Sequence, residues 1–249
     1  MLLNKFIKKT GLYFIFLKKV FQKPEKWKIF WKQLFSEADK LVISSTLIVG
    51  IISLFIGGVL VIQTASNLLN PLIDKMYVGY LVRESLILEF CSTMIGLILA
   101  GKIGSRISSE LGSMRISDQI DAMDMMGVNS AGFLVLPKIL STTLLSPFLM
   151  LLSLFLGILG GYLVVFFTGV ISIDQYTRGL LYWYNSYYVF YAGVKTAVFC
   201  FIVSSISSFY GYYAEGGSIG VGHNSTKAII YSSILILVFD LILTHLMLY

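Results

Sequence analysis

The stretch LVISSTLIVGIISLFIGGVLVIQTAS, residues 41–66, carries no charged side chain over its whole length. A helix needs about 20 apolar residues to cross the hydrocarbon core of a bilayer, so this stretch predicts a transmembrane helix. Four more apolar stretches follow it, near residues 85–101, 138–167, 187–211 and 228–248. We therefore expect an all-α integral membrane protein with five transmembrane helices.

The composition agrees with a single membrane domain. The 249 residues are 57% hydrophobic and only 13% charged, whereas a soluble domain has about 25% charged residues. The net charge of +6 does not indicate nucleic-acid binding, because most of the basic residues come ahead of the first span. Cys91 and Cys200 both fall in apolar segments, which favours packing over a disulfide.

Two of the predicted spans are irregular. The second is short, and it could extend upstream through residues 80–83 as a tilted or broken helix. The third is long and contains Pro147, Gly157, Gly160 and Gly161, which predicts a kink or a strong tilt.

Residues 1–40 form a separate basic region. The apolar run at 12–17 is too short for a secretory signal, lysines follow it closely, and no small-residue cleavage site appears. Pro24 suits the first turn of a helix, and a stripe of large apolar residues at helical spacing follows it, made of Trp27, Phe30, Trp31, Leu34 and Phe35. An aromatic face flanked by lysines predicts an amphipathic interfacial helix that lies in the headgroup layer.

The distribution of basic residues predicts the topology. Fifteen of the nineteen Lys and Arg residues fall on the same side of the predicted spans as the N-terminus, ten of them lysines before residue 41. Segments rich in Lys and Arg stay in the cytoplasm. We therefore expect a cytoplasmic N-terminus and a C-terminus on the outer side.

The segment SELGSMRISDQIDAMDMMGVN, residues 109–129, is polar although the chain is apolar on both sides of it. It falls in the cytoplasm between the second and third spans. Ser117 is suited to cap a short helix over 117–126, and Gly127 is placed to end it in a left-handed conformation.

Each face of this short helix has its own chemistry. Ile116, Ile120 and Met123 share one face, and the opposite face carries Ser117, Asp121 and Asp124, with Asp118 at its edge. A helix of about ten residues is not stable alone in water. We expect its apolar face to rest on the membrane domain and its acidic face to meet a partner. The three aspartates spread over too wide an arc to converge on a metal ion.

No enzyme motif is recognisable in the chain. The glycine-rich run GGSIGVGHNSTK, residues 216–227, has Gly217 and Gly222 at the spacing of a phosphate loop, but His223 and Asn224 stand where such a loop needs Lys and Ser or Thr. We expect a tight cytoplasmic turn here, with Asn224 or Ser225 capping the fifth span. ATP hydrolysis and cofactor binding are not expected in this chain.

Ionisable residues inside predicted spans indicate function by default. They are Glu89, Lys195 and Asp240, with His245 near the chain end better explained by a structural or interfacial role. Lys195 and Asp240 fall at similar depths, ~12 and ~13 Å from the outer ends of their spans at 1.5 Å per residue. We predict that they share a polar pocket in the outer half of the bilayer, either on the path of a lipid headgroup or as a plain structural pair.

Two blocks of the sequence resemble a known family. The run AGKIGSRISSELGSMRISDQIDAMDMMGVNSAGFLVLPKIL (100–140) and the run GYYAEGGSIGVGHNSTKAIIYSSILILVFDLILTHLML (211–248) are similar to the signature blocks of the MlaE/YrbE permeases. The resemblance makes residues 41–249 the permease membrane domain. The family often has an Arg-Glu pair entering the second span, and this chain has Leu88 and Glu89 at that place.

The resemblance implies a homodimeric permease in the bacterial inner membrane with a periplasmic C-terminus. Its partners would be an ABC ATPase that holds ATP and Mg, an MCE-domain protein and a small STAS-domain subunit, and its substrate would be phospholipid moved between the inner and outer membranes. Residues implied in ATPase coupling are Glu110, Arg115, Asp118, Asp121, Met123, Asp124, Met126 and Gly127, and those implied in the cytoplasmic turn are Glu215, Gly216, Gly217, Gly220 and Gly222.

Two other functions share the apolar spans and intramembrane charges. A membrane-embedded lipid-modifying enzyme would need a nucleophile and a base, and no motif of that kind is found. An ion-driven secondary transporter would be favoured by inverted repeats, and none is visible.

Overall fold

The computed structural model describes residues 2–22, 27–68 and 74–248, and within these ranges the chain is helical without strands. The main helices are α1 (Leu2–Val20), α2 (Trp27–Glu37), α3 (Thr46–Asn67), α4 (Met76–Ser85), α5 (Ile95–Leu99), α6 (Ser105–Ile116), α7 (Gln119–Met125), α8 (Ser130–Thr168), α9 (Ile173–Leu181), α10 (Ser186–Tyr212) and α11 (Gly217–Leu248). Wider π-helical turns at Ala38–Val42, Leu86–Met94 and Ala100–Gly104 join several of them without a break.

The prediction of five membrane-spanning helices is confirmed. Five helices are long and apolar enough to cross a bilayer, namely Trp27–Asn67, Met76–Ile116, Ser130–Thr168, Ser186–Tyr212 and Gly217–Leu248. Each contains one predicted apolar stretch and extends beyond it. The second span does continue upstream, since its helix begins at Met76.

Glycines in the first and third spans serve close packing. A Cβ atom added at Gly57 in α3 would lie 1.8 Å from the Gly157 carbonyl oxygen in α8, and one added at Gly160 would lie 1.9 Å from the Leu54 oxygen. Small residues let membrane helices approach backbone to backbone. Next to this contact, the hydroxyls of Ser53 and Ser153 lie 2.6 Å apart and join the same two helices.

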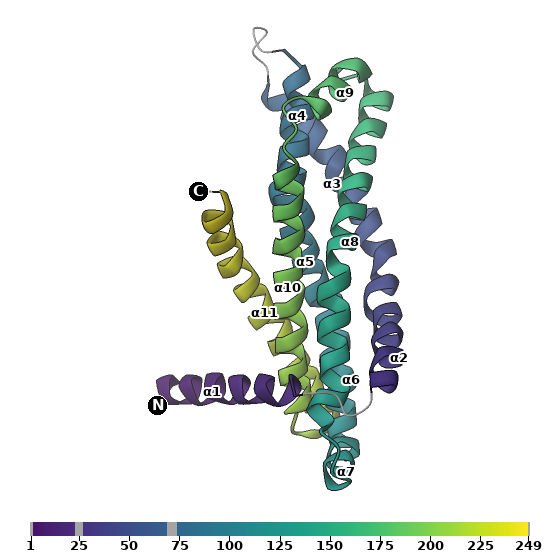
Figure 1. Ribbon diagram of the computed structural model, residues 1–249. Coiled ribbons are helices and arrows are strands. Elements are labelled where there is room, and N and C mark those ends of the chain that lie inside the picture. Colours follow the sequence, from purple (N-terminus) through teal and green to yellow (C-terminus); the bar gives the residue numbers. More distant parts are fainter. Residues whose placement is uncertain (1, 23–26, 69–73, 249) are drawn as a thin grey trace.

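The N-terminal region differs from the prediction. The helix of residues 27–37 does not lie crosswise as a separate interfacial helix, because it continues directly into the first span (Figure 1). Phe30 and Leu34 of the predicted stripe are buried, and α2 packs along α8, while Trp27, Trp31 and Phe35 point outward. The predicted boundary after residue 40 therefore falls within one continuous helix, and Pro24 lies outside the described residues.

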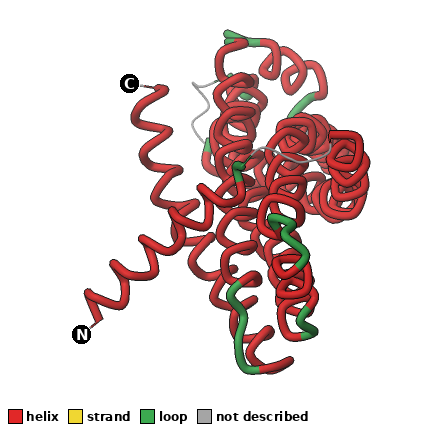
Figure 2. The backbone as a smooth tube through the Cα atoms, turned by 60° about the horizontal axis from the view of Figure 1, so that its bottom comes forward, coloured by secondary structure: helices red, strands yellow, loops and turns green. Residues whose placement is uncertain are grey.

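The helix that does lie crosswise is α1. Figure 1 shows it running across the end of the bundle that also carries α6 and α7. In Figure 2, which brings this end forward, α1 and α11 both lead away from the main bundle. The predicted place of the interfacial helix, residues 27–37, is therefore wrong, because these residues are part of the first span. An interfacial position of α1 stays a prediction.

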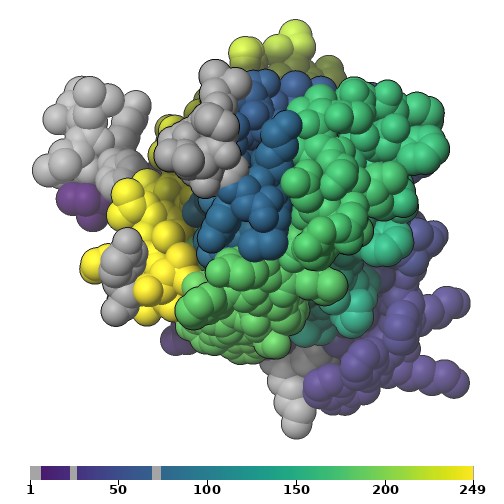
Figure 3. All heavy atoms as spheres, turned by 90° about the horizontal axis from the view of Figure 1, so that it is seen from above, coloured from purple at the N-terminus to yellow at the C-terminus, as the bar shows by residue number. Residues whose placement is uncertain are grey.

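The opposite end of the bundle is built from α4 and α9. Seen from above in Figure 3, the blue atoms of α4 lie against the green atoms of α9 and the segment after it. Arg83 of α4 is buried here, and its guanidinium donates to the carbonyl oxygens of Leu180 (2.7 Å) and Tyr182 (2.9 Å) and to the Glu84 carboxylate (2.5 Å). These bonds fasten the loop that leads into α10.

Candidate functional site

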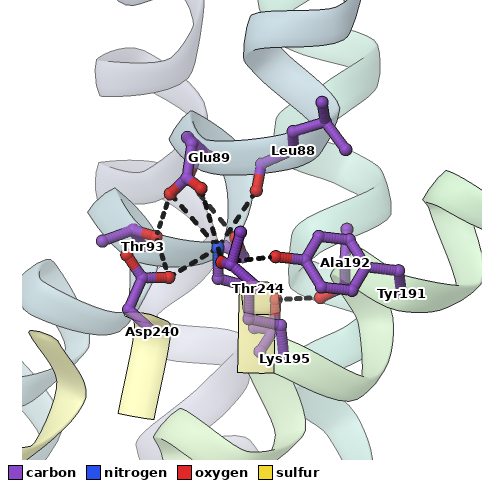
Figure 4. Close-up of polar contacts among 10 residues, drawn as sticks. Leu88, Glu89, Thr93, Tyr191, Ala192, Lys195, Asp240 and Thr244 are labelled. Carbon is purple, nitrogen blue, oxygen red and sulfur yellow. Dashed lines mark hydrogen bonds and ion pairs between the residues drawn. The ribbon is translucent and has the colours of Figure 1, made fainter. Parts of the chain in front are cut away.

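A cluster of charged side chains lies between three spans (Figure 4). Lys195 of α10 is fully buried, and its Nζ lies 2.5 Å from Asp240 of α11 and 3.1 Å from Glu89 of the second span. It also donates to the Leu88 carbonyl oxygen at 3.1 Å. One ammonium group therefore holds two carboxylates from two different helices.

Hydroxyl groups complete the cluster. Thr93 Oγ1 lies 3.1 Å from both Glu89 and Asp240 and so bridges the two carboxylates. Thr244 Oγ1 lies 3.3 Å from Lys195 Nζ and 2.8 Å from the Tyr191 hydroxyl, whose ring also flanks the ammonium at 5.2 Å. These hydroxyls supply hydrogen bonds that a buried charge needs where water is scarce.

The predicted pair of Lys195 and Asp240 is present in the structure. Glu89 was also predicted as an ionisable residue inside a span, but no partner was predicted for it. In the structure it is the third charged member of the cluster. Thr93, Thr244 and Tyr191 were missed, although each stands four residues from a charged member on its own helix, a spacing that places two side chains on one face. Whether the cluster meets a lipid headgroup stays a prediction.

The cluster is more open on one side than on the other. The side chain of Glu89 is 46% exposed, that of Asp240 is 18% exposed, and that of Lys195 is 0% exposed. Glu89 lies in the π-helical segment Leu86–Met94. Such segments are frequent at functional sites because they break the regular α-helical bonding and re-aim side chains.

At the end of the bundle that α1 crosses, the predicted short helix is present as α7, but its start differs. Asp118 adopts a left-handed backbone conformation (φ 56°) between α6 and α7, and Ser117 turns back to donate to the Ser113 oxygen at 2.8 Å. Ser117 therefore does not cap α7, because the preceding helix already extends to Ile116. The end is as predicted, with Gly127 left-handed at φ 79°.

The bend at Asp118 also breaks the predicted apolar face. Ile120 is fully buried and Met123 is half-buried, but Ile116 is exposed because it belongs to α6. The most exposed apolar side chains of this tip are Met125 (89%) and Met126 (71%). Met126 was among the predicted residues, and Met125 was missed because the predicted face was drawn on one unbroken helix.

The aspartates of α7 already have partners within the chain. Asp121 is paired with Arg115, while Asp124 accepts from Ser130 Oγ at 2.6 Å and lies 3.7 Å from Lys19 Nζ. Partial burial raises the pKa of Asp124, but the hydrogen bond from Ser130 and the charge of Lys19 outweigh it and hold the pKa below the ordinary 3.8. Asp118 is the one aspartate of this segment that forms no ion pair with a residue in the described ranges.

Glu110 is part of a second ion network. Lys138, which is 2% exposed, lies 2.6 Å from Glu37 and 2.9 Å from Glu110. The network joins the end of α2, the middle of α6 and the first turns of α8. It joins α6, which leads into α7, to the first and third spans.

The glycine-rich turn is shorter than predicted. The fifth span already begins at Gly217, so Asn224 and Ser225 lie inside α11 and do not cap it. Gly216 and Gly217 have positive φ values of 89° and 65°, and a Cβ atom at Gly220 would lie 1.8 Å from the Glu215 oxygen. The glycines thus allow the tight start of the helix, while Gly222 has open space around it and Glu215 is exposed.

Comparison with known proteins decides the family. The family model described as Permease MlaE matches residues 34–246, which include the second, third and fourth spans in full and most of the first and fifth. The chain belongs to the MlaE permease family.

Similar curated proteins carry transporter names. A probable ABC transporter permease protein of Rickettsia bellii is 33% identical over 83% of this chain and 82% of that protein. The intermembrane phospholipid transport system permease protein MlaE of Haemophilus influenzae is 30% identical over 83% of this chain and 79% of its own length. The chloroplastic protein trigalactosyldiacylglycerol 1 of Arabidopsis thaliana is 27% identical over 88% of this chain and 62% of its own length.

At one position the sequence of this chain departs from the pattern expected of the MlaE family. Leu88 stands where the resemblance leads one to expect an arginine beside Glu89. In the structure Lys195 from the neighbouring α10 supplies a cation to Glu89, and the Leu88 backbone oxygen accepts from the same ammonium.

Proposed function

We propose that this MlaE-family chain is the permease subunit of an ABC transporter that moves phospholipids between the inner and outer membranes of a bacterium, and so contributes to outer-membrane lipid asymmetry. The observation that carries the proposal is the cluster of Glu89, Lys195 and Asp240 within the spans. Charged groups inside a membrane are costly, and their retention marks pathways for polar cargo. The exposed carboxylate of Glu89 is the group of this cluster that a passing headgroup would meet.

Coupling to ATP hydrolysis is assigned to α7. The chain has no lysine at the place where a phosphate loop needs one, so the proposal puts ATP and Mg in a separate ATPase subunit. Exposed Met125 and Met126 at the tip suit a hydrophobic groove on that subunit, since methionine adapts to irregular surfaces. The proposed assembly is a homodimer in the inner membrane with an MCE-domain protein and a small STAS-domain subunit.

The proposed orientation puts α1 and α7 in the cytoplasm and α4, α9 and the C-terminus on the periplasmic side. It rests on the excess of Lys and Arg at the α7 end of the chain.

Lipid transfer between vesicles tests the role of the cluster. Reconstituted complexes carrying Glu89→Gln should lose most transfer while remaining folded, because the exposed carboxylate is lost but Asp240 still holds Lys195. Asp174→Asn is the matched control, since Asp174 lies exposed on α9 far from the cluster. Full transfer by Glu89→Gln, or transfer that follows an ion gradient without ATP, would contradict the proposal.

Copurification tests the coupling helix. The double variant Met125→Ser with Met126→Ser should lose the ATPase during purification, whereas Leu181→Ser, an equally exposed apolar residue at the other end, should keep it. Charge reversal at Asp124 is a poorer test, because it would also break the contacts to Ser130 and Lys19. An unchanged yield of ATPase from the methionine variant would exclude α7 as the docking element.

A further inference from the structure

The crosswise helix α1 has a free face whose chemistry is that of a membrane surface. Ile7, Phe14, Ile15 and Phe21 are exposed, with Phe14 at 64% and Ile15 at 69%. Exposed lysines stand beside them at Lys8 and Lys18, whereas the Lys9 ammonium lies over the Tyr210 ring of α10, 6.0 Å from its centroid. Helices with an apolar face and basic flanks lie in the interface and prefer anionic lipids. α1 also lies outside residues 34–246, so the family match does not cover it.

The other face of α1 is fixed to the bundle. Phe16 and Val20 are buried, and the Phe16 ring lies 5.8 Å from that of Phe209 and 5.2 Å from that of Tyr212, both near the cytoplasmic end of α10. The Tyr13 hydroxyl lies 2.8 Å from Ser205 Oγ. The position of α1 is therefore set by protein contacts on one side, and the helix leads away from the main bundle (Figures 1 and 2). Its exposed apolar residues Phe14 and Ile15 take no part in these contacts with α10.

The end of α1 is tied to the loop that carries α7. Asn129 Nδ2 donates to the Lys19 carbonyl oxygen at 2.9 Å, while Asn129 Oδ1 accepts from Gly132 N and caps α8. Lys19 Nζ lies 3.7 Å from Asp124, the residue that also accepts from Ser130. These contacts join the end of α1 directly to the last turn of α7 and the first turn of α8.

We propose that α1 binds anionic lipid headgroups of the leaflet that it faces and, through Lys19, Asp124 and Asn129, passes the state of that leaflet to α7. The partner is the lipid surface itself, chosen by the complementarity of the lysines to anionic headgroups and of the aromatic stripe to acyl chains. The proposal concerns this chain alone and does not depend on the cargo of the transporter.

Hydrogen exchange of the full chain in vesicles tests it. Vesicles of phosphatidylcholine alone are compared with an equimolar mixture of phosphatidylcholine and phosphatidylglycerol. In the mixture, amides of α1 and of residues 119–130 should exchange several-fold more slowly. The double variant Lys8→Gln, Lys18→Gln should lose both effects, while the control Lys28→Gln, Lys32→Gln, which removes equal charge from α2, should keep them.

Asp124→Asn separates binding from transmission. In this variant α1 should still respond to phosphatidylglycerol, but residues 119–130 should respond less than in the wild type because the ion pair with Lys19 is gone. Equal exchange of α1 in the two kinds of vesicle would overturn lipid binding. If phosphatidylglycerol slows the exchange of α1 in the wild type but leaves that of residues 119–130 unchanged, the proposed coupling of α1 to α7 is wrong.

Discussion

At the scale of the residue, Lys195 determines the stability of the intramembrane cluster. It is buried and stands between two carboxylates that come from different helices. Removing one partner of a buried ion pair is far more costly than removing the pair, because the remaining charge is left without compensation.

Lys195→Met should therefore lower the free energy of unfolding by about 3 kcal/mol, the low end of the range for broken buried pairs since Glu89 is half exposed. The triple variant Lys195→Met, Glu89→Gln, Asp240→Asn should recover part of that loss. Thermal unfolding in detergent measures both. If the triple variant is less stable than Lys195→Met, the cluster is not held by charge. A simple exchange of charges between Lys195 and Asp240 is less informative, because it would place a carboxylate beside Glu89.

A second prediction at this scale concerns pH. Since the pKa of Asp124 lies below 3.8 in the folded chain, its contribution to stability is present above the unfolded value and is lost only as the pH falls through the lowered pKa. Burial raises the pKa of Tyr213 nearby, so its hydroxyl stays neutral throughout this range. The distance between spin labels at Leu12→Cys and Met125→Cys should thus be constant from neutral pH down to about 4 and change only below it. A change near neutral pH would show that another group controls the contact.

At the scale of the element, the membrane-spanning helices could be predicted from the sequence, but the residues at which helices begin and end could not. Five spans follow from apolar length because the bilayer sets one minimum for all of them. Helix ends depend on single backbone conformations, such as the left-handed Asp118 and Gly216, which no periodic pattern encodes. The place of the crosswise helix was missed because α1 and α2 both carry large apolar residues among lysines, and only the folded chain shows that α2 continues into the first span.

A prediction about stability concerns Gly127, which ends α7 in a left-handed conformation. An alanine there would keep a positive φ of 79° with no neighbour within 4 Å, so the cost is conformational alone, about 1 kcal/mol. Gly222→Ala is the matched control, because Gly222 also has open space but lies inside α11, where alanine is favoured. Denaturant unfolding should give Gly127→Ala a lower free energy of unfolding than the wild type. The free energy of unfolding of Gly222→Ala should equal or exceed that of the wild type. Equal losses in both variants would mean that the left-handed conformation of Gly127 is not required.

At the scale of the whole molecule, the first and third spans cross with their backbones in direct contact. Glycine at this crossing was predicted to kink or tilt the third span, yet its evident contribution is to let α3 and α8 touch. The members of the cluster could be named from sequence, since charges in apolar stretches stand out. The pairing of Lys195 with Asp240 could be predicted as well, from their similar depths in the bilayer. The contact of Glu89 with that pair could not, because it arises from the packing of the second span against α10 and follows from no spacing along the chain.

Gly160→Ala tests how far the fold depends on that crossing. Its Cβ would lie 1.9 Å from the Leu54 carbonyl oxygen, a backbone atom that cannot turn aside, so α3 and α8 must separate. Overpacking of this kind costs about 1–3 kcal/mol, and the separation should also weaken the bond between Ser53 and Ser153 that lies beside it. We expect a lower midpoint of thermal unfolding in detergent with membrane insertion unchanged, because the apolar length of both spans is kept. Gly222→Ala, which adds the same methyl group in open space, should leave the midpoint where it is or raise it. If Gly160→Ala unfolds at the wild-type temperature, the two spans are not locked at this point and their packing must be held elsewhere.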